Sequence, residues 1–260
     1  MAEPRATGAA VCVLAGAIAA TLAVVVGPGP SLAGYVSEAG VAGNRYAWTY
    51  RLGLFTLGAA LLLLASALRD HAVALHHAGS GGHPICRQRR DHPTRPDHPA
   101  RRDQPARQPD KALRVAVLLL VAGALATVLS AGVPCSTGCP LPPFEAATVA
   151  DLVHGAVSIV AAGATVLAMI AIVLSRAAAN PLRRTARISL AAALPLAGAL
   201  ALAMLFIGRG PLAGVLERLL LLVIVSWGVA TAVILATGPA AAGRQDPFAR
   251  APAHHGRPSG

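Results

Sequence analysis

Charged residues are scarce in this chain of 260 residues, where they make up 13% of the total. A soluble domain carries roughly a quarter, so about half of the usual charge is missing. The charges are also segregated, because long stretches carry none and most arginines fall within 44–51, 69–114, 176–187 and 244–257. This distribution is typical of a protein whose main solvent is lipid and whose charged residues lie in loops.

Cysteines and catalytic motifs are also few. Four cysteines, Cys12, Cys86, Cys135 and Cys139, are too few for a disulfide scaffold. Phosphate-binding glycine loops, HExxH and GxSxG are absent, and a haem held by two histidines would need them on facing helices. The sequence therefore gives no positive indication of an enzyme, and we expect no cofactor and no bound metal.

Six apolar segments are long enough, or nearly so, to cross about 30 Å of hydrocarbon as helices. We therefore predict an all-α polytopic membrane helix bundle with six transmembrane helices. The predicted spans are Gly8–Gly27, Leu52–Leu68, Val115–Val133, Leu152–Ser175, Ile188–Gly208 and Leu219–Gly238.

Lysines and arginines predict the orientation of these spans. With the N-terminus in the cytoplasm, 18 of the 22 basic residues fall on cytoplasmic segments. The outer loops then hold only Arg45, Arg51, Arg209 and Arg218. Both termini are predicted to be cytoplasmic, in a multi-pass protein of the plasma membrane whose partners are membrane lipids. The net charge of +11 is explained by this sorting, so we expect no nucleic-acid partner.

A cleaved signal peptide is the competing interpretation of the first span. Arg5, the apolar run and the small residues at 31–33 resemble its parts. The run is about 20 residues long, whereas such segments usually have 7–15. Cleavage would leave five spans and an N-terminus outside the cell.

Residues 69–114, between the second and third spans, differ completely from their surroundings. They hold six of the nine histidines, Cys86, and a six-residue repeat of the kind Arg-Asp-His-Pro-Ala-Arg between 90 and 107. Proline at every sixth position excludes a regular helix, so we predict a disordered cytoplasmic loop. A transition-metal site and contact with anionic lipid are the alternatives. The boundaries that follow are 1–68 with an outer loop at 28–51, then 69–114, 115–238 and a disordered tail at 239–260.

The predicted outer loops contain the candidate functional residues. The first outer loop contains Glu38, Asn44 and Arg45 among aromatic residues that could equally form an interfacial belt. In the second outer loop, Cys135 and Cys139 would meet an oxidising compartment, which favours a disulfide over two free thiols. A metal site there would need further ligands, and the sequence shows none nearby.

Ionisable residues also occur at the outer ends of the fourth and sixth spans. Asp151 and His154 are three residues apart, so they share a helix face, and an ionisable residue inside a span is a functional candidate by default. Helix capping is the alternative for both. Glu217 and Arg218 begin the sixth span, where a carboxylate is favoured by the helix dipole. The predicted outer-face polar cluster comprises Glu38, Asn44, Arg45, Asp151, His154, Glu217 and Arg218.

Three stretches of the sequence resemble a bacterial membrane family called domain of unknown function 998. They are the segment from Tyr35 through Glu38 to Asn44, the segment from Pro134 to His154, and Gly214 to Arg218 followed by Trp227. The resemblance spans most of the chain except 69–112. It implies six helices in the plasma membrane and no established activity.

Three classes of function remain open from the sequence. The first is a small transporter, channel or lipid-interacting protein that uses the outer polar cluster. The second is a membrane enzyme acting on lipid or envelope precursors, with Asp151 and His154 as metal ligands or as acid and base. The third is an assembly protein without chemistry, whose protein partner the sequence does not identify.

Overall fold

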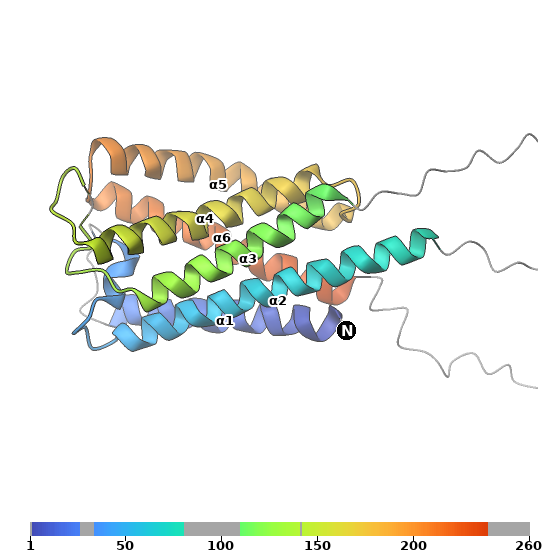
Figure 1. Cartoon of the computed structure of the whole chain (residues 1–260), viewed down its shortest axis with the longest axis horizontal. Coiled ribbons are helices and arrows are strands. Elements are labelled where there is room, and N and C mark those ends of the chain that lie inside the picture. Colours follow the sequence, from blue (N-terminus) through green and yellow to red (C-terminus); the bar gives the residue numbers. More distant parts are fainter. Residues whose placement is uncertain (1, 27–33, 81–109, 141, 239–260) are drawn as a thin grey trace, which may run out of the picture.

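The computed structural model describes residues 2–26, 34–80, 110–140 and 142–238. In these ranges it contains six long α-helices, one short 3-10 helix (η1) and no strand, which confirms the predicted all-α helix bundle. The helices run alternately up and down (Figure 1). Their bounds are α1 Ala2–Val26, η1 Val36–Gly40, α2 Ala47–Ser80, α3 Lys111–Gly132, α4 Val149–Leu174, α5 Asn180–Phe206 and α6 Pro211–Thr237.

The six helices form a closed bundle. Each helix packs against the next one along the chain, and α6 packs back against α1. The start of α1 at Ala2 and the end of α6 at Thr237 therefore lie at the same end of the bundle (Figure 1). We call this the basic end, and we call the opposite end, which holds η1 and the connections 133–148 and 207–210, the cap end.

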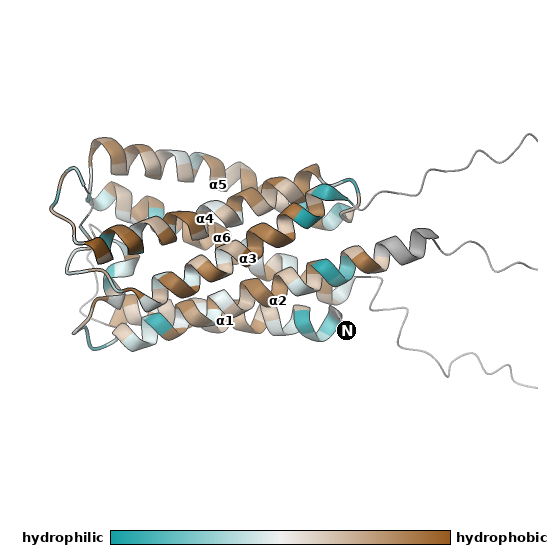
Figure 2. Cartoon of the chain, viewed as in Figure 1, coloured by the Kyte–Doolittle hydropathy of each residue, from teal (hydrophilic) through white to brown (hydrophobic). Residues whose placement is uncertain are grey.

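All six helices are long and apolar enough to cross a membrane. Large apolar side chains point outward, as on α1, where Val11, Leu14, Ile18 and Leu22 are exposed. Figure 2 shows the hydrophobic surface along the helices and hydrophilic residues toward the two ends. Because exposed apolar surface on this scale requires lipid as the solvent, the chain is a multi-pass integral membrane protein.

Small residues allow the helices of the bundle to approach closely. A Cβ atom built on Gly16 of α1 would lie 2.7 Å from the carbonyl oxygen of Gly53 in α2. One built on Gly53 would lie 2.8 Å from the carbonyl oxygen of Gly16 and 2.9 Å from the amide nitrogen of Ala20. The two backbones are thus in direct contact, which is how small residues stabilise helix pairs in lipid.

The helices extend beyond the apolar runs that predicted them. α2 continues to Ser80 and α3 begins at Lys111, so the ends of the predicted disordered loop 69–114 are helical. The physical reason is that helical hydrogen bonding does not stop where apolar residues stop, and residues 69–80 contain no proline. Asp110 also caps the start of α3. The remainder of that loop, the tail 239–260 and the possible cleavage site at 31–33 lie outside the described residues.

Candidate functional site

At the cap end, Glu38 of η1 joins two segments that are far apart in the sequence. Its Oε1 atom accepts a hydrogen bond from the amide of Tyr35 at 3.0 Å, which caps η1. Arg209, in the connection between α5 and α6, donates to both carboxylate oxygens at 2.9–3.0 Å. Two-point pairing of this kind fixes geometry as well as charge, so Glu38 fastens the first connection to the last one.

Glu217 and Arg218, in the second turn of α6, hold the same segment from the other side. A carboxylate oxygen of Glu217 accepts a hydrogen bond from the amide of Val36 at 2.8 Å. The Arg218 guanidinium donates to the carbonyl oxygens of Gly34 at 3.1 Å and Gly214 at 2.7 Å. Both side chains thus bind the backbone around η1 and keep it over the end of the bundle.

Asp151 fastens the second connection to the start of α4. It accepts hydrogen bonds from the amide and hydroxyl of Ser136, at 2.6 and 2.9 Å, and from the amide and hydroxyl of Thr148, at 2.8 and 2.7 Å. Thr148 in turn caps the helix by accepting from the amide of Asp151. With 2% of its surface exposed, this carboxylate acts as a structural anchor, because its acceptor positions are already used.

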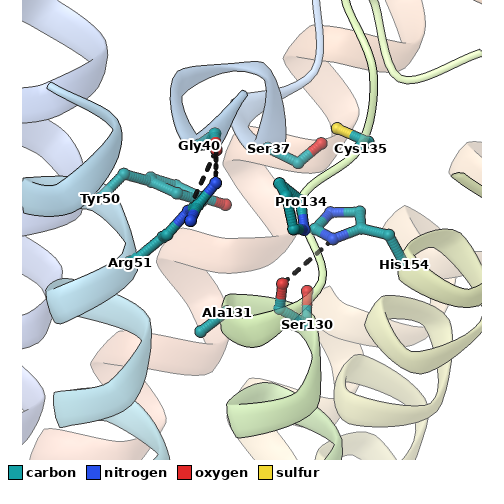
Figure 3. A pocket seen from close by; sticks show the side chains of 9 residues that line it. All are labelled: Ser37, Gly40, Tyr50, Arg51, Ser130, Ala131, Pro134, Cys135 and His154. Atoms are coloured by element: carbon teal, nitrogen blue, oxygen red, sulfur yellow. Dashed lines mark hydrogen bonds between the residues drawn. The ribbon is translucent and has the colours of Figure 1, made fainter. Parts of the chain in front are cut away.

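His154 lies one turn further into α4 and is 5% exposed. Its Nδ1 atom lies 2.7 Å from the carbonyl oxygen of Val133. It also lies 3.1 Å from the carbonyl oxygen of Ser130, a contact drawn in Figure 3. Carbonyl oxygens only accept, so Nδ1 carries a proton, and the tautomer that fits these contacts has its lone pair on Nε2. That Nε2 atom is buried and has no hydrogen-bond partner in the described part of the chain.

Cys135 and Cys139 are joined as a disulfide directly beside this imidazole. A ring nitrogen of His154 and the two Sγ atoms all lie within 4.8 Å of one another. The hydroxyl of Ser37, from η1, donates to Sγ of Cys139 at 3.4 Å. The spacing along the sequence does not show that His154 lies beside the cysteines, because this contact depends on the connection folding back over α4.

A narrow hollow separates this sulfur and imidazole group from the start of α2. It is lined by Cys135 and His154 on one side and by Tyr50 and Arg51 on the other, and it has no room for a water molecule (Figure 3). The Arg51 guanidinium donates to the carbonyl oxygen of Gly40 at 3.1 and 3.3 Å. The residues around the hollow are therefore closely packed, and hydrogen bonds such as those from Arg51 to Gly40 hold them in place.

The predicted polar cluster is brought together only in part. Asn44 accepts from the amide of Tyr46 at 3.2 Å, and the guanidinium of Arg45 lies 5.8 Å from the centre of the Tyr46 ring, so both contacts are local. Arg209 and Ser136 belong to the network and were not predicted as members. Neither carries a local signal, since each acts through a contact across the bundle, whereas the spacing of Thr148 and Asp151 matches a capping box.

The basic end holds an open hollow of about 480 Å³ along the first two turns of α5. Asn180, Arg183, Arg184 and Arg187, at helical spacings of three and four, line it together with Pro181. No side chain caps this helix start. None of the three arginines has an ion-pair partner among the described residues, where ion pairs are formed by Arg5 with Asp70 and by Arg209 with Glu38.

Asp110 positions the start of α5 relative to α3. It caps α3 by accepting from the amide of Ala112 at 3.0 Å, and it accepts from the hydroxyl of Ser175 at 2.7 Å and the amide of Ala177 at 2.8 Å. Burial alone would raise the pKa of this carboxyl, but the hydrogen bonds outweigh burial and lower its pKa below the ordinary value. The connection that leads into the arginine hollow is thereby fixed.

Comparison with known protein families gives a match over about half of the chain. The model of a family described as "Protein of unknown function (DUF998)" matches residues 104–234, which include Cys135, Asp151, His154 and the arginine hollow. The match begins after α2, so the resemblance noted between Tyr35 and Asn44 stays a prediction. No curated protein and no solved structure matches the chain.

Proposed function

We propose a function for this chain, which belongs to the DUF998 family of proteins of unknown function, from the geometry of its own residues. It is a lipid-interacting multi-pass membrane protein that binds the headgroup phosphates of anionic phospholipids at its basic end. The observation that carries this proposal is the arginine hollow at the start of α5.

The chemistry of the hollow suits a phosphate group. Three guanidinium groups on one helix face offer paired donors, which phosphate oxygens accept well. The start of α5 adds uncapped backbone amides and the positive end of the helix dipole. The Nε atom of Arg183 is buried without a hydrogen-bond partner in the described ranges, so a bound oxygen would satisfy it.

The position of the hollow at one end of a membrane-spanning helix supports the same ligand. The α5 span begins at Asn180, so the arginines lie at the depth where lipid headgroups are found. We propose further that the basic end faces the cytoplasmic leaflet of the plasma membrane, as the positive-inside rule favours. Anionic lipid is concentrated on that leaflet, where each arginine near the surface contributes about 1 kcal/mol.

In this proposal, the polar residues at the cap end hold the connections over the bundle and keep that end closed. Glu38, Asp151, Glu217 and Arg218 all bind the segments that cover the bundle. A transport function that uses these residues would require the bonds to open during each cycle. Glu38→Gln, which weakens the two-point pair with Arg209, would then change a solute flux, whereas lipid binding at the basic end would continue.

The test is lipid-dependent stability in nanodiscs. For the unmodified protein, we expect a higher melting temperature in phosphatidylglycerol than in phosphatidylcholine. Arg183→Gln/Arg184→Gln/Arg187→Gln should lose this difference. The control Arg69→Gln/Lys111→Gln/Arg114→Gln removes three exposed basic residues from the same end and should keep most of it. If both triple variants lost the melting-temperature difference equally, net charge alone would explain it, and that result would contradict a specific site.

A further inference from the structure

We propose that Cys135, Cys139 and His154 form a binding site for a soft monovalent metal ion, of which copper(I) is the chemical type, and that the disulfide keeps this site closed until it is reduced. The proposal is independent of lipid binding at the basic end. It rests on the buried residues Cys135, Cys139 and His154, whose two Sγ atoms and one ring nitrogen the connection over α4 brings within 4.8 Å of one another.

The imidazole is already prepared as a ligand. Nδ1 of His154 donates to the backbone carbonyl of Val133, which is the arrangement that fixes the tautomer and ring orientation of metal-binding histidines. Nε2 is left buried with no partner among the described residues. An unpaired nitrogen lone pair in a buried site is costly, and coordination to a metal would satisfy it.

Reduction converts the two sulfur atoms into the other two ligands. A dithiol reductant transfers two electrons and two protons to the disulfide, giving two cysteine thiols and the disulfide of the reductant. The sulfur atoms then separate to about 3.6–4 Å, which is close to the spacing of thiolate ligands around one metal. Binding of copper(I) releases the two thiol protons and forms two sulfur–metal bonds and one nitrogen–metal bond.

The surroundings of the site favour copper(I) over zinc. Thiolates select soft ions, and structural zinc usually takes four ligands in a tetrahedron. Here three ligands are available, and the adjoining hollow has no room for a water molecule as the fourth. The bound group would carry one net negative charge, beside the hydroxyl of Ser37, which already donates to Cys139, and near Arg209, whose guanidinium lies against Gly138.

The experiment titrates the purified full-length protein with copper(I) supplied as its bicinchoninate complex. Protein reduced with a phosphine should bind one equivalent more copper than Cys135→Ser/Cys139→Ser, which keeps every histidine of the 69–114 segment. Oxidised protein should show no excess. His154→Ala should bind at least about tenfold more weakly, because loss of even an outer-shell partner costs about 10–100-fold in metal affinity. His92→Ala, from the repeat segment, should not differ from the unmodified protein.

A second measurement covers the case in which His154→Ala does not fold. Copper(I) should protect Cys135 and Cys139 of the reduced unmodified protein from alkylation, as read by mass spectrometry, while Cys12 serves as the internal reference. The proposal is overturned if the reduced protein binds no more copper than the double serine variant, or if the oxidised form binds as much. Alkylation of all three cysteines at unchanged rates overturns it as well.

Discussion

At the scale of single residues, Asp151 is the clearest case of a polar group that stabilises the fold. Replacing it by asparagine leaves the amides of Ser136 and Thr148 without a charged acceptor. We expect Asp151→Asn to lower the free energy of unfolding by about 1.5–3 kcal/mol, seen as a lower melting temperature in detergent. Glu145→Gln, an exposed carboxylate in the same connection, should change it by less than about 0.5 kcal/mol. Equal melting temperatures would contradict the anchoring role.

Asp110 gives a residue-scale prediction on pH. Its folded-state pKa is lowered from the ordinary 3.8, so the ionised form stabilises the protein. This contribution is complete above the ordinary value and disappears as the pH falls through the lower folded-state pKa. Asparagine at position 110 can still cap α3. In Asp110→Asn, however, the melting temperature should fall less steeply as the pH drops below about 5. Glu3→Gln should leave that fall unchanged, and an identical slope in both variants would remove Asp110 from the explanation.

At the scale of helices, contact between α1 and α2 depends on glycine. A side chain at Gly53 would meet backbone atoms of α1, whereas one at Gly163 of α4 meets nothing within 4 Å. We expect Gly53→Leu to destabilise the bundle by about 1–3 kcal/mol or more, because the added side chain overpacks the contact. The yield of monodisperse protein should fall as a result. Gly163→Leu should be tolerated, because it faces open space and leucine favours helix. Similar yields for the two variants would show that α1 and α2 can move apart without loss of the fold.

The helices themselves were predictable from the sequence, but their ends and contacts were only partly so. Apolar runs identify the six spans because lipid requires about 20 such residues, yet α2 continues to Ser80, well beyond its apolar run. The shared face of Asp151 and His154 follows from their spacing. Their contacts with Ser136 and Cys135 do not, since these depend on how a connection folds back over α4. The arginines at 183, 184 and 187 were visible in the sequence, where they were interpreted only as a sign of orientation.

At the scale of the whole molecule, orientation is the property that labelling tests. In intact cells, an impermeant thiol reagent should label Cys135 and Cys139 only after reduction, and Cys86 should not react until the membrane is permeabilised. This result follows if the cap end lies outside and the basic end in the cytoplasm. Labelling of Cys86 from outside would show that the protein has the opposite orientation, with the arginine hollow at the other leaflet.

The most direct measurement of the central claim is native mass spectrometry of protein extracted from membranes rich in phosphatidylglycerol. Each arginine contributes about 1 kcal/mol to headgroup binding, so removing three should weaken it by roughly a hundredfold. We predict that bound phosphatidylglycerol remains on the unmodified protein and on Arg69→Gln/Lys111→Gln/Arg114→Gln, but is lost from Arg183→Gln/Arg184→Gln/Arg187→Gln. Equal retention of phosphatidylglycerol by all three proteins would contradict the claim that the hollow at the start of α5 binds anionic lipid.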